Sequence, residues 1–140
     1  MCGGRRIAAE KSHATLAFLG DVPQEQFDAL SRAPHDLQAK SFELVLDQPR
    51  YWKDNRIAFA GSSHAPPELG KLADSLRERL QCAGLPFDPK PFVPHVTLLR
   101  EARRPAVMPA FEPIGWPVRE FSLVRSTGGR YEVLSRWPLD

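Results

Sequence analysis

The chain has 140 residues, with 19 Lys and Arg against 17 Asp and Glu and a formal charge of +2. This length predicts a single domain, residues 1–140, that can bury a core. The near-neutral charge excludes a protein that coats long nucleic acid or a membrane surface. No apolar stretch approaches roughly 18 residues and no hydrophobic leader begins the sequence, so we expect a cytoplasmic protein without membrane association.

The chain contains two cysteines, Cys2 near its start and Cys82 late in a helical pattern. They provide neither a disulfide framework nor the spacing of metal ligands. We therefore expect both thiols to be reduced and structurally incidental.

The first half of the chain predicts three strands and one short helix. Residues 13–19 alternate small and large side chains, which predicts a strand that closes at Gly20. A helix should follow, with Asp21 as N-cap, Pro23 in its first turn and Pro34 at its end. Residues 42–47 and 57–60 predict two strands that are joined through a polar turn at 53–56.

The second half opens with the clearest helix, predicted over Pro67–Ala83. Its apolar residues recur on one face, namely Leu69, Leu72, Ala73, Leu76 and Leu80. Gly84 is typical of a left-handed C-cap, and Pro86 prevents continuation. Strands are predicted at 93–99, 120–124 and 131–134, the last two around a turn at 126–129. Some six strands with two helices indicate an α+β fold.

A short motif occurs twice in the chain, as His13-Ala14-Thr15-Leu16 and His95-Val96-Thr97-Leu98. The chain has four histidines and three threonines. The probability that two of these threonines each follow a histidine by two positions is on the order of 0.2%, before the shared leucine is considered. On a strand, a spacing of two places His and Thr on the same face. Each copy therefore predicts an imidazole beside a hydroxyl.

Two imidazoles in one site suit phosphodiester chemistry that needs no metal. One histidine can accept a proton from the attacking water or hydroxyl while the other donates a proton to the departing oxygen. The threonine hydroxyls can donate to the phosphate oxygens, where negative charge is held. A single histidine on a strand is usually structural, and this is the interpretation we give to His35 and His64, which lack such a partner.

The surroundings of both motifs resemble those of the 2H phosphoesterases, in particular the RNA 2′,3′-cyclic phosphodiesterases, also called 2′-5′ RNA ligases. The similarity extends from Ser12 over nearly the whole chain. It rests on three segments, Ser12-His13-Ala14-Thr15-Leu16-Ala17-Phe18-Leu19-Gly20, Pro91-Phe92-Val93-Pro94-His95-Val96-Thr97-Leu98 with Arg100, and the ending Tyr131-Glu132-Val133-Leu134-Ser135-Arg136-Trp137-Pro138-Leu139.

The resemblance implies a bilobal α+β fold, with two antiparallel sheets flanking a central cleft. Each pseudo-symmetric lobe is expected to contribute one His-x-Thr motif. Members of the family carry an apolar strand and a helix before the first motif, and only twelve residues precede His13 here. The N-terminal strand and helix are therefore expected to be missing, which would leave a sheet edge uncovered.

The resemblance also implies the reaction, which is hydrolysis of an RNA terminal 2′,3′-cyclic phosphate to a 2′-phosphate without metal or cofactor. In the family the first histidine is the proton donor and the second the proton acceptor, which corresponds to His13 and His95. In the ligation direction a 5′-hydroxyl would attack the cyclic phosphate and form a 2′-5′ bond. The expected partners are RNA ends with a cyclic phosphate, and the protein is expected to be a monomer.

Three substrate-binding residues are predicted, Thr15, Thr97 and Arg100. Arg100 is a candidate phosphate ligand because a guanidinium matches paired phosphate oxygens. Five residues after His95, however, it belongs to the opposite face of a regular strand. It reaches the site only if the chain bends or bulges after Leu99.

Residues 50–56, Arg50-Tyr51-Trp52-Lys53-Asp54-Asn55-Arg56, alternate basic and aromatic side chains. This pattern is found in proteins that bind single-stranded RNA, and equally in a hairpin with aromatic packing. Two other functions also fit the sequence. One is a phosphodiesterase for another cyclic nucleotide or RNA 3′ end, and the other is a module that binds RNA ends without turnover.

Overall fold

The computed structural model describes residues 5–6, 13–100 and 111–140, and the chain divides into two compact units. The first unit contains Met1–Thr15, Leu44–Ala65 and Val93–Trp116. The second unit contains Leu16–Glu43, Pro66–Phe92 and Pro117–Asp140. Both units therefore draw on segments from the beginning, middle and end of the chain. Cys2 lies outside the described residues.

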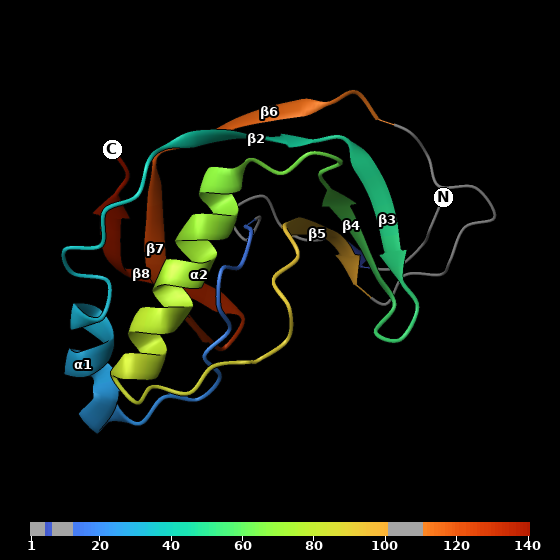
Figure 1. Ribbon diagram of the computed structural model, residues 1–140. Helices are drawn as coiled ribbons and strands as arrows, with labels where there is room; N and C mark the ends of the chain where they lie inside the picture. Colours follow the sequence, from blue (N-terminus) through green and yellow to red (C-terminus); the bar gives the residue numbers. More distant parts are fainter. Residues whose placement is uncertain (1–4, 7–12, 101–110) are drawn as a thin grey trace. The chain divides into compact units, whose positions relative to one another are not determined.

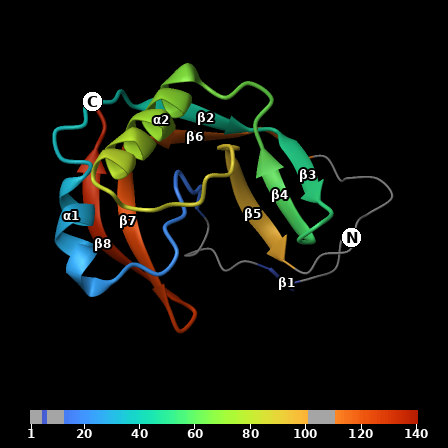
Figure 2. The ribbon, with the colours of Figure 1, turned by 60° about the horizontal axis from the view of Figure 1, so that its bottom comes forward.

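The first unit is built on a four-stranded antiparallel sheet with the order β1-β5-β4-β3. Its strands are β1 (Arg5–Arg6), β3 (Gln48–Trp52), β4 (Ile57–Gly61) and β5 (His95–Arg100). Figure 2 shows β5 beside β4 and β4 beside β3. The strand β5 thus lies between β4, which pairs with most of its length, and β1, which pairs with it at Leu99 and Arg100.

The return strand predicted at 57–60 is confirmed as β4, but its partner differs from the prediction. It pairs with Gln48–Trp52, with Trp52 opposite Ile57 across the turn. The missed strand contains Pro49, which marks turns in a sequence and is tolerated in a strand only at a sheet edge. As β3 is the last strand of the sheet, it meets that condition.

The second unit packs two helices against an antiparallel ribbon. It contains α1 (Phe27–Arg32), α2 (Pro67–Cys82), β7 (Glu120–Thr127) and β8 (Arg130–Pro138), with β7 and β8 paired. In Figure 1, α2 crosses in front of β7 and β8, and α1 lies near its C-terminal end. The buried core of this unit consists of Leu30, Leu72, Leu76, Leu80, Leu85 and Phe121.

The long helix follows its prediction closely. Its five apolar stripe residues are all buried, and Gly84 adopts a φ of +72° just after the helix. The amide of Leu85 donates to the carbonyl oxygen of Leu80 at 2.9 Å, which closes the end of the helix. The predicted turn between β7 and β8 is also confirmed, with Gly128 and Gly129 at positive φ.

The short helix is confirmed, but Asp21 as its N-cap is wrong. A 3₁₀ turn, Gln24–Gln26, precedes α1, and the residue at its N-terminal cap position is Pro23. The proline ring disfavours a helical conformation at the residue before it. The helical turns therefore begin after Pro23, too far along the chain for Asp21 to cap them.

The strand predicted at 13–19 is wrong, because the described residues 13–19 have no strand pairing. The carbonyl oxygen of Leu16 accepts from the Arg77 guanidinium, with both N···O distances 3.4 Å, and that of Phe18 accepts from the amide of Asp88 at 2.8 Å. Leu16 and the adjacent Ala17 both pack against the core of the second unit. An alternating pattern gives a strand only where a neighbouring strand supplies the hydrogen bonds.

A third sheet has two strands, β2 (Phe42–Leu46) and β6 (Ile114–Val118). The buried residues Leu44 and Leu46 confirm the alternation predicted for the first of these strands. The second strand was not predicted, since Gly115 and Pro117 within it are typical of a loop.

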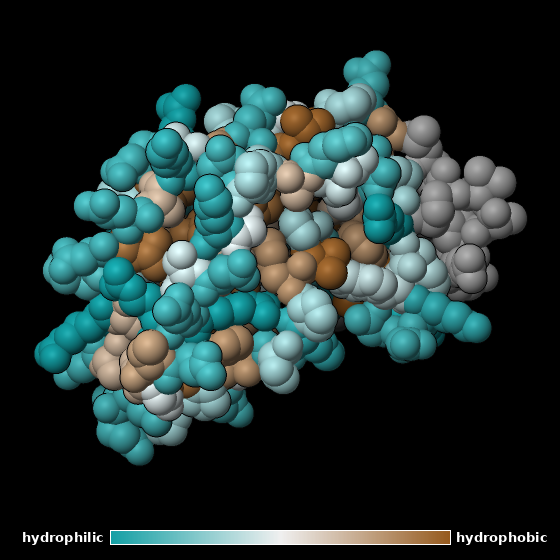
Figure 3. Space-filling model, viewed as in Figure 1, coloured by the Kyte–Doolittle hydropathy of each residue, from teal (hydrophilic) through white to brown (hydrophobic). Residues whose placement is uncertain are grey.

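Hydrophilic side chains dominate the face seen in Figure 3, with apolar residues scattered between them. In the part of the chain that the structure describes, no helix is long and apolar enough to cross a membrane.

Candidate functional site

Three of the five predicted site residues lie on β5, in the interior of the first unit's sheet. His95 is paired with Gly61 of β4, and Thr97 is paired with Phe59. Paired residues on neighbouring strands share a face of the sheet. His95 and Thr97 therefore lie on one face, together with Phe59, and this is the arrangement that the second motif predicted.

A bulge in β5 resolves the position of Arg100. Thr97 pairs with Phe59 and Leu99 with the adjacent Ala58, so Leu98 is an extra residue in β5. Consecutive side chains of β4 point to opposite faces of the sheet, so Ala58 lies on the face opposite to Phe59. Leu99 shares the face of Ala58, against which it packs. Arg100, the next residue, returns to the face of His95.

The predicted bulge thus exists, but it lies before Leu99 and not after it. His95, Thr97 and Arg100 consequently project from the same face of the sheet. We call this the His95 face; it carries Gln48, Arg50, Trp52, Ile57, Phe59, Gly61, His95, Thr97 and Arg100. Arg100 is half-buried and has no ion pair with any residue that the structure describes.

The orientation of the His95 ring follows from one hydrogen bond. Its Nδ1 lies 2.7 Å from the carbonyl oxygen of Val93. A carbonyl oxygen only accepts, so Nδ1 carries the hydrogen and donates it. In the neutral ring the lone pair is then on Nε2, which leaves this nitrogen able to accept a proton.

Two aromatic rings hold the imidazole from the adjoining hairpin. The centroid of the Trp52 ring is 4.7 Å from that of His95 at an interplanar angle of 72°, and the Phe59 centroid is 5.6 Å away at 74°. Trp52 and Phe59 in turn contact each other at 4.0 Å. Such edge-on contacts restrict the orientation of the ring.

Residues 50–56 were open to two interpretations, a segment that binds single-stranded RNA and a hairpin with aromatic packing. The aromatic contacts show which local structure they form. These residues form the end of β3 and the turn into β4, with the Trp52 ring in tilted contact with Phe59. The hairpin interpretation is therefore confirmed. It does not exclude contact with a ligand, because Trp52 is only half-buried.

The first motif lies in the same unit, whose opening segment ends at Thr15. His13 is exposed and Thr15 is half-buried. Neither residue is in a strand, so their predicted placement on one strand face is wrong. The first unit includes both His-x-Thr pairs, since its last segment begins at Val93, and this differs from the expected one motif in each lobe.

The other two histidines contact residues next to them in sequence. His35 Nε2 is 3.6 Å from a carboxylate oxygen of Asp36, and both side chains are exposed. His64 Nδ1 is 3.1 Å from the hydroxyl oxygen of Ser63. The described residues include no cluster of three His, Cys, Asp or Glu that could hold a metal ion.

The Ser63 hydroxyl also donates to Asp47, at 2.5 Å, and the Ser63 amide donates to the same carboxylate at 2.8 Å. These hydrogen bonds hold the pKa of Asp47 below its ordinary value of 3.8, and the bond from the hydroxyl has the largest effect. The network joins the chain just after β2 to the chain just after β4, at the end of the sheet where β5 begins.

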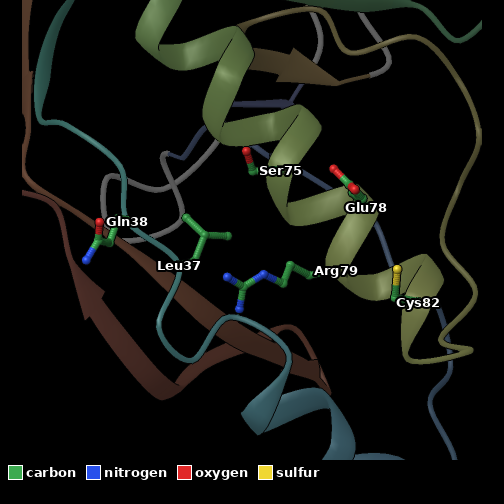
Figure 4. Close-up of a pocket in the computed structure, with 6 residues that line it drawn as sticks. All are labelled: Leu37, Gln38, Ser75, Glu78, Arg79 and Cys82. Atoms are coloured by element: carbon green, nitrogen blue, oxygen red, sulfur yellow. The ribbon is translucent and has the colours of Figure 1, made fainter.

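A surface hollow in the second unit contains none of the predicted site residues. Figure 4 shows its side chains on α2 and on the loop opposite, with Arg79 reaching across. It is lined by Leu37, Gln38, Ser75, Glu78, Arg79 and Cys82. The Arg79 guanidinium donates to the carbonyl oxygen of His35 at 2.5 Å, so this cation serves to hold the loop.

The sequence did not single out Arg50 among the residues of its segment, and Gln48 was missed altogether. The Arg50 guanidinium donates to Gln48 Oε1, with Nε at 2.9 Å and Nη2 in a still closer contact. Both belong to the His95 face, since Arg50 pairs with Phe59 and Gln48 with Gly61. An alternation of side chains over 48–52 was the available signal, and Pro49 hid it.

Comparisons with known proteins agree with this fold and these motifs. A family model described as the 2′-5′ RNA ligase superfamily matches residues 2–130. An RNA 2′,3′-cyclic phosphodiesterase of Escherichia coli (strain K12) is 37% identical, over 97% of this chain and 80% of the relative. One of Thermus thermophilus is 32% identical, over 98% of this chain and 76% of the relative.

The similarity extends to solved structures. A crystal structure of E. coli LigT complexed with 3′-AMP superimposes with a TM-score of 0.89 at 36% identity, over 97% of this chain and 81% of that one. A structure of T. thermophilus TT0787 gives a TM-score of 0.73 at 31% identity, over 96% and 81%. The expected α+β fold of the 2H phosphoesterase class is therefore confirmed.

The matched family model and the two relatives narrow the class further. This chain belongs to the 2′-5′ RNA ligase superfamily of the 2H phosphoesterases.

Proposed function

We propose that this chain is an RNA 2′,3′-cyclic phosphodiesterase, which opens the terminal cyclic phosphate of an RNA to leave a 2′-phosphate. The observation that carries the proposal is the His95 face, where an oriented imidazole, a hydroxyl and a guanidinium without a described ionic partner share one side of a sheet. The names of the relatives, both called RNA 2′,3′-cyclic phosphodiesterase, supply the substrate class.

His95 is proposed as the proton acceptor. Its Nε2 lone pair takes a proton from water while the water oxygen bonds to phosphorus. The hydrogen bond from Nδ1 to Val93 supports this role, because it fixes the tautomer in which Nε2 is unprotonated. The two aromatic contacts hold the imidazole in the orientation in which Nε2 accepts the proton.

His13 is proposed as the proton donor. The bond between phosphorus and O3′ breaks, and the proton of the His13 imidazolium goes to the departing O3′. The product keeps its phosphate on O2′. His95 then releases its proton to solvent and His13 takes one up from solvent, which restores both histidines. Membership of both motifs in the first unit supports a shared site.

Thr15, Thr97 and Arg100 are proposed to bind the phosphate. The hydroxyls donate to nonbridging oxygens, on which charge grows as water attacks. The guanidinium of Arg100 adds a charge-assisted hydrogen bond. Neither role requires a metal, and we propose that none takes part.

The same groups can also catalyse ligation, in which another hydroxyl takes the place of water. If an RNA 5′-hydroxyl replaces water, its proton goes to the accepting histidine and its oxygen bonds to phosphorus. Release of O3′ then leaves a 2′-5′ linkage. We propose this ligation as a secondary activity of the same site.

The test uses a 5′-labelled oligonucleotide that ends in a 2′,3′-cyclic phosphate. We expect conversion to the 2′-phosphate, identified by comparison with 2′- and 3′-phosphate standards, in EDTA as well as in buffer. A 3′-phosphate product, or hydrolysis only of a free cyclic nucleotide such as 3′,5′-cAMP, would show a different phosphodiesterase.

Binding without hydrolysis would identify a module for RNA ends. Single-turnover kinetics with excess protein, run beside a measurement of affinity for the same RNA, separates these outcomes. Loss of activity in EDTA and its recovery with added metal would overturn the proposed mechanism.

A further inference from the structure

Arg50 lies on the His95 face, two strands from β5, and the proposed reaction gives it no role. Its backbone is paired with Phe59, which is itself paired with Thr97. Neighbouring strands are about 4.8 Å apart, so the backbones of Arg50 and Thr97, two strands apart, are separated by roughly 10 Å. An arginine side chain spans most of that distance.

The side chain of Arg50 runs over Gly61, the residue paired with His95. A Cβ atom at Gly61 would lie 3.4 Å from Arg50 Cδ and 3.5 Å from its Nε. Cβ atoms of paired residues are about 5 Å apart, so the Arg50 stem lies within one residue's width of the His95 side chain. Gly61 thus leaves the space over which Arg50 extends.

The charge of Arg50 is held in position and is not neutralised by any described residue. Its two hydrogen bonds go to the neutral amide oxygen of Gln48, and no carboxylate among the described residues pairs with it. Arg125 and Arg136 in the second unit, in contrast, pair with Glu132 and Glu120. A fixed, exposed guanidinium that lacks a counter-ion is suited to an anionic ligand.

From this geometry we infer that Arg50, oriented by Gln48, binds the phosphodiester next to the terminal cyclic phosphate of the RNA substrate. The inference rests on the proposed function, because it takes His95 and Thr97 to hold the cyclic phosphate. A substrate of two or more nucleotides then has an anion beside β3, and a mononucleotide has none. Arg50 would make the site prefer an RNA end over a free cyclic nucleotide.

The test compares three substrates: a nucleoside 2′,3′-cyclic phosphate, a dinucleotide with the same cyclic end, and that dinucleotide with a neutral methylphosphonate linkage. Arg50→Gln should lower kcat/KM for the charged dinucleotide by about 10- to 100-fold, mainly through KM, as expected for loss of a charged hydrogen bond. The mononucleotide and the methylphosphonate should change by less than about twofold, as neither carries the second charge.

Arg56→Gln is the matched control, because it removes the same charge from the exposed turn of the same hairpin. It should leave all three substrates nearly unchanged. Circular dichroism and thermal unfolding verify that each variant is folded.

Equal losses on the mononucleotide and the dinucleotide, or equal effects of Arg50→Gln and Arg56→Gln, would overturn the inference. If wild-type protein hydrolyses neither substrate, the proposed function fails by itself. The inference is then judged by binding of a 2′-phosphorylated dinucleotide and mononucleotide. It stands if Arg50→Gln weakens only the dinucleotide, and it falls if both or neither are weakened.

Discussion

Trp52 and His95 belong to strands that are not neighbours, yet their ring centroids are 4.7 Å apart and their planes meet at 72°. The contact passes over β4, whose Phe59 touches both rings. The hydrogen bond to Val93 fixes one edge of the imidazole, and the aromatic pair restricts how the ring tilts about it.

Trp52→Leu is expected to lower kcat about tenfold, because the imidazole loses an aromatic contact that orients it. The KM for a mononucleotide cyclic phosphate should change little. Steady-state kinetics on that substrate measures both constants. Trp137→Leu serves as control, as it removes a stacked tryptophan, 5.3 Å from Phe121, in the second unit. A loss of kcat in both variants would indicate general destabilisation instead of a role at His95.

The two threonines are predicted to act on the phosphate and not on protons. Thr15→Val and Thr97→Val keep the shape of the side chain and remove the hydroxyl. Each should reduce the rate of hydrolysis by about 10²-fold, by comparison with donors in other anion-binding sites. Rapid-quench kinetics at saturating substrate measures the effect, and an unchanged urea transition shows that the fold persists. Full activity in both variants would remove the hydroxyls from the mechanism.

Features set by residues close in sequence could be predicted, and those set by distant pairing could not. The buried stripe of α2 and its glycine C-cap follow from a period of 3.6 and from Gly84, so the sequence predicted both. The alternation over residues 13–19 was just as visible. It predicted a strand wrongly, because no strand pairs with those residues in the described chain.

The site shows the same limit. His95 and Thr97 share a face through their spacing alone, which the motif made clear. Arg100 joins them only because Leu98 is bulged, and that bulge is defined by the pairing of β5 with Ala58 and Phe59. Nothing within residues 95–100 specifies it.

Two glycines at and near α2 should respond to alanine in opposite ways. Gly84→Ala places a side chain at a φ of +72° and should cost about 1 kcal/mol in the free energy of unfolding. Gly70 is inside the helix, and an added Cβ would meet nothing within 4 Å. Gly70→Ala should therefore stabilise the protein by about 0.5–1 kcal/mol. Urea unfolding of both variants at one pH gives the two signs, and the same sign for both would contradict the described end of α2.

The Asp47 network predicts how acid affects the first unit. Since hydrogen bonds from Ser63 lower the pKa of Asp47 in the folded state, the carboxylate contributes stability above its ordinary pKa of 3.8. That contribution should be lost as the pH falls below this value and the group is protonated. Asp47→Asn should lower the urea midpoint at pH 7 and reduce the loss of stability between pH 5 and about pH 3.

Ser63→Ala is the partner variant, because it removes the hydroxyl that donates to Asp47 and keeps the amide that also donates. It should reduce the same acid response by a smaller amount. If wild type and Asp47→Asn lose stability in parallel between pH 5 and pH 3, the network does not contribute.

The last prediction concerns the two histidines as a unit. If one must be neutral to accept a proton while the other must be charged to donate it, kcat/KM for the cyclic phosphate should be bell-shaped in pH. His13→Ala should remove the limb that falls at high pH, and His95→Ala the limb that falls at low pH, each with loss of most of the chemical step. The double variant should be little slower than either single variant, because each proton transfer depends on the other. Affinity for a 2′-phosphorylated dinucleotide should largely persist in all three, held by Thr15, Thr97 and Arg100. If the fold-losses in rate of the two single variants multiply in the double variant, the histidines act independently. Near-normal turnover in either single variant would exclude that residue from catalysis.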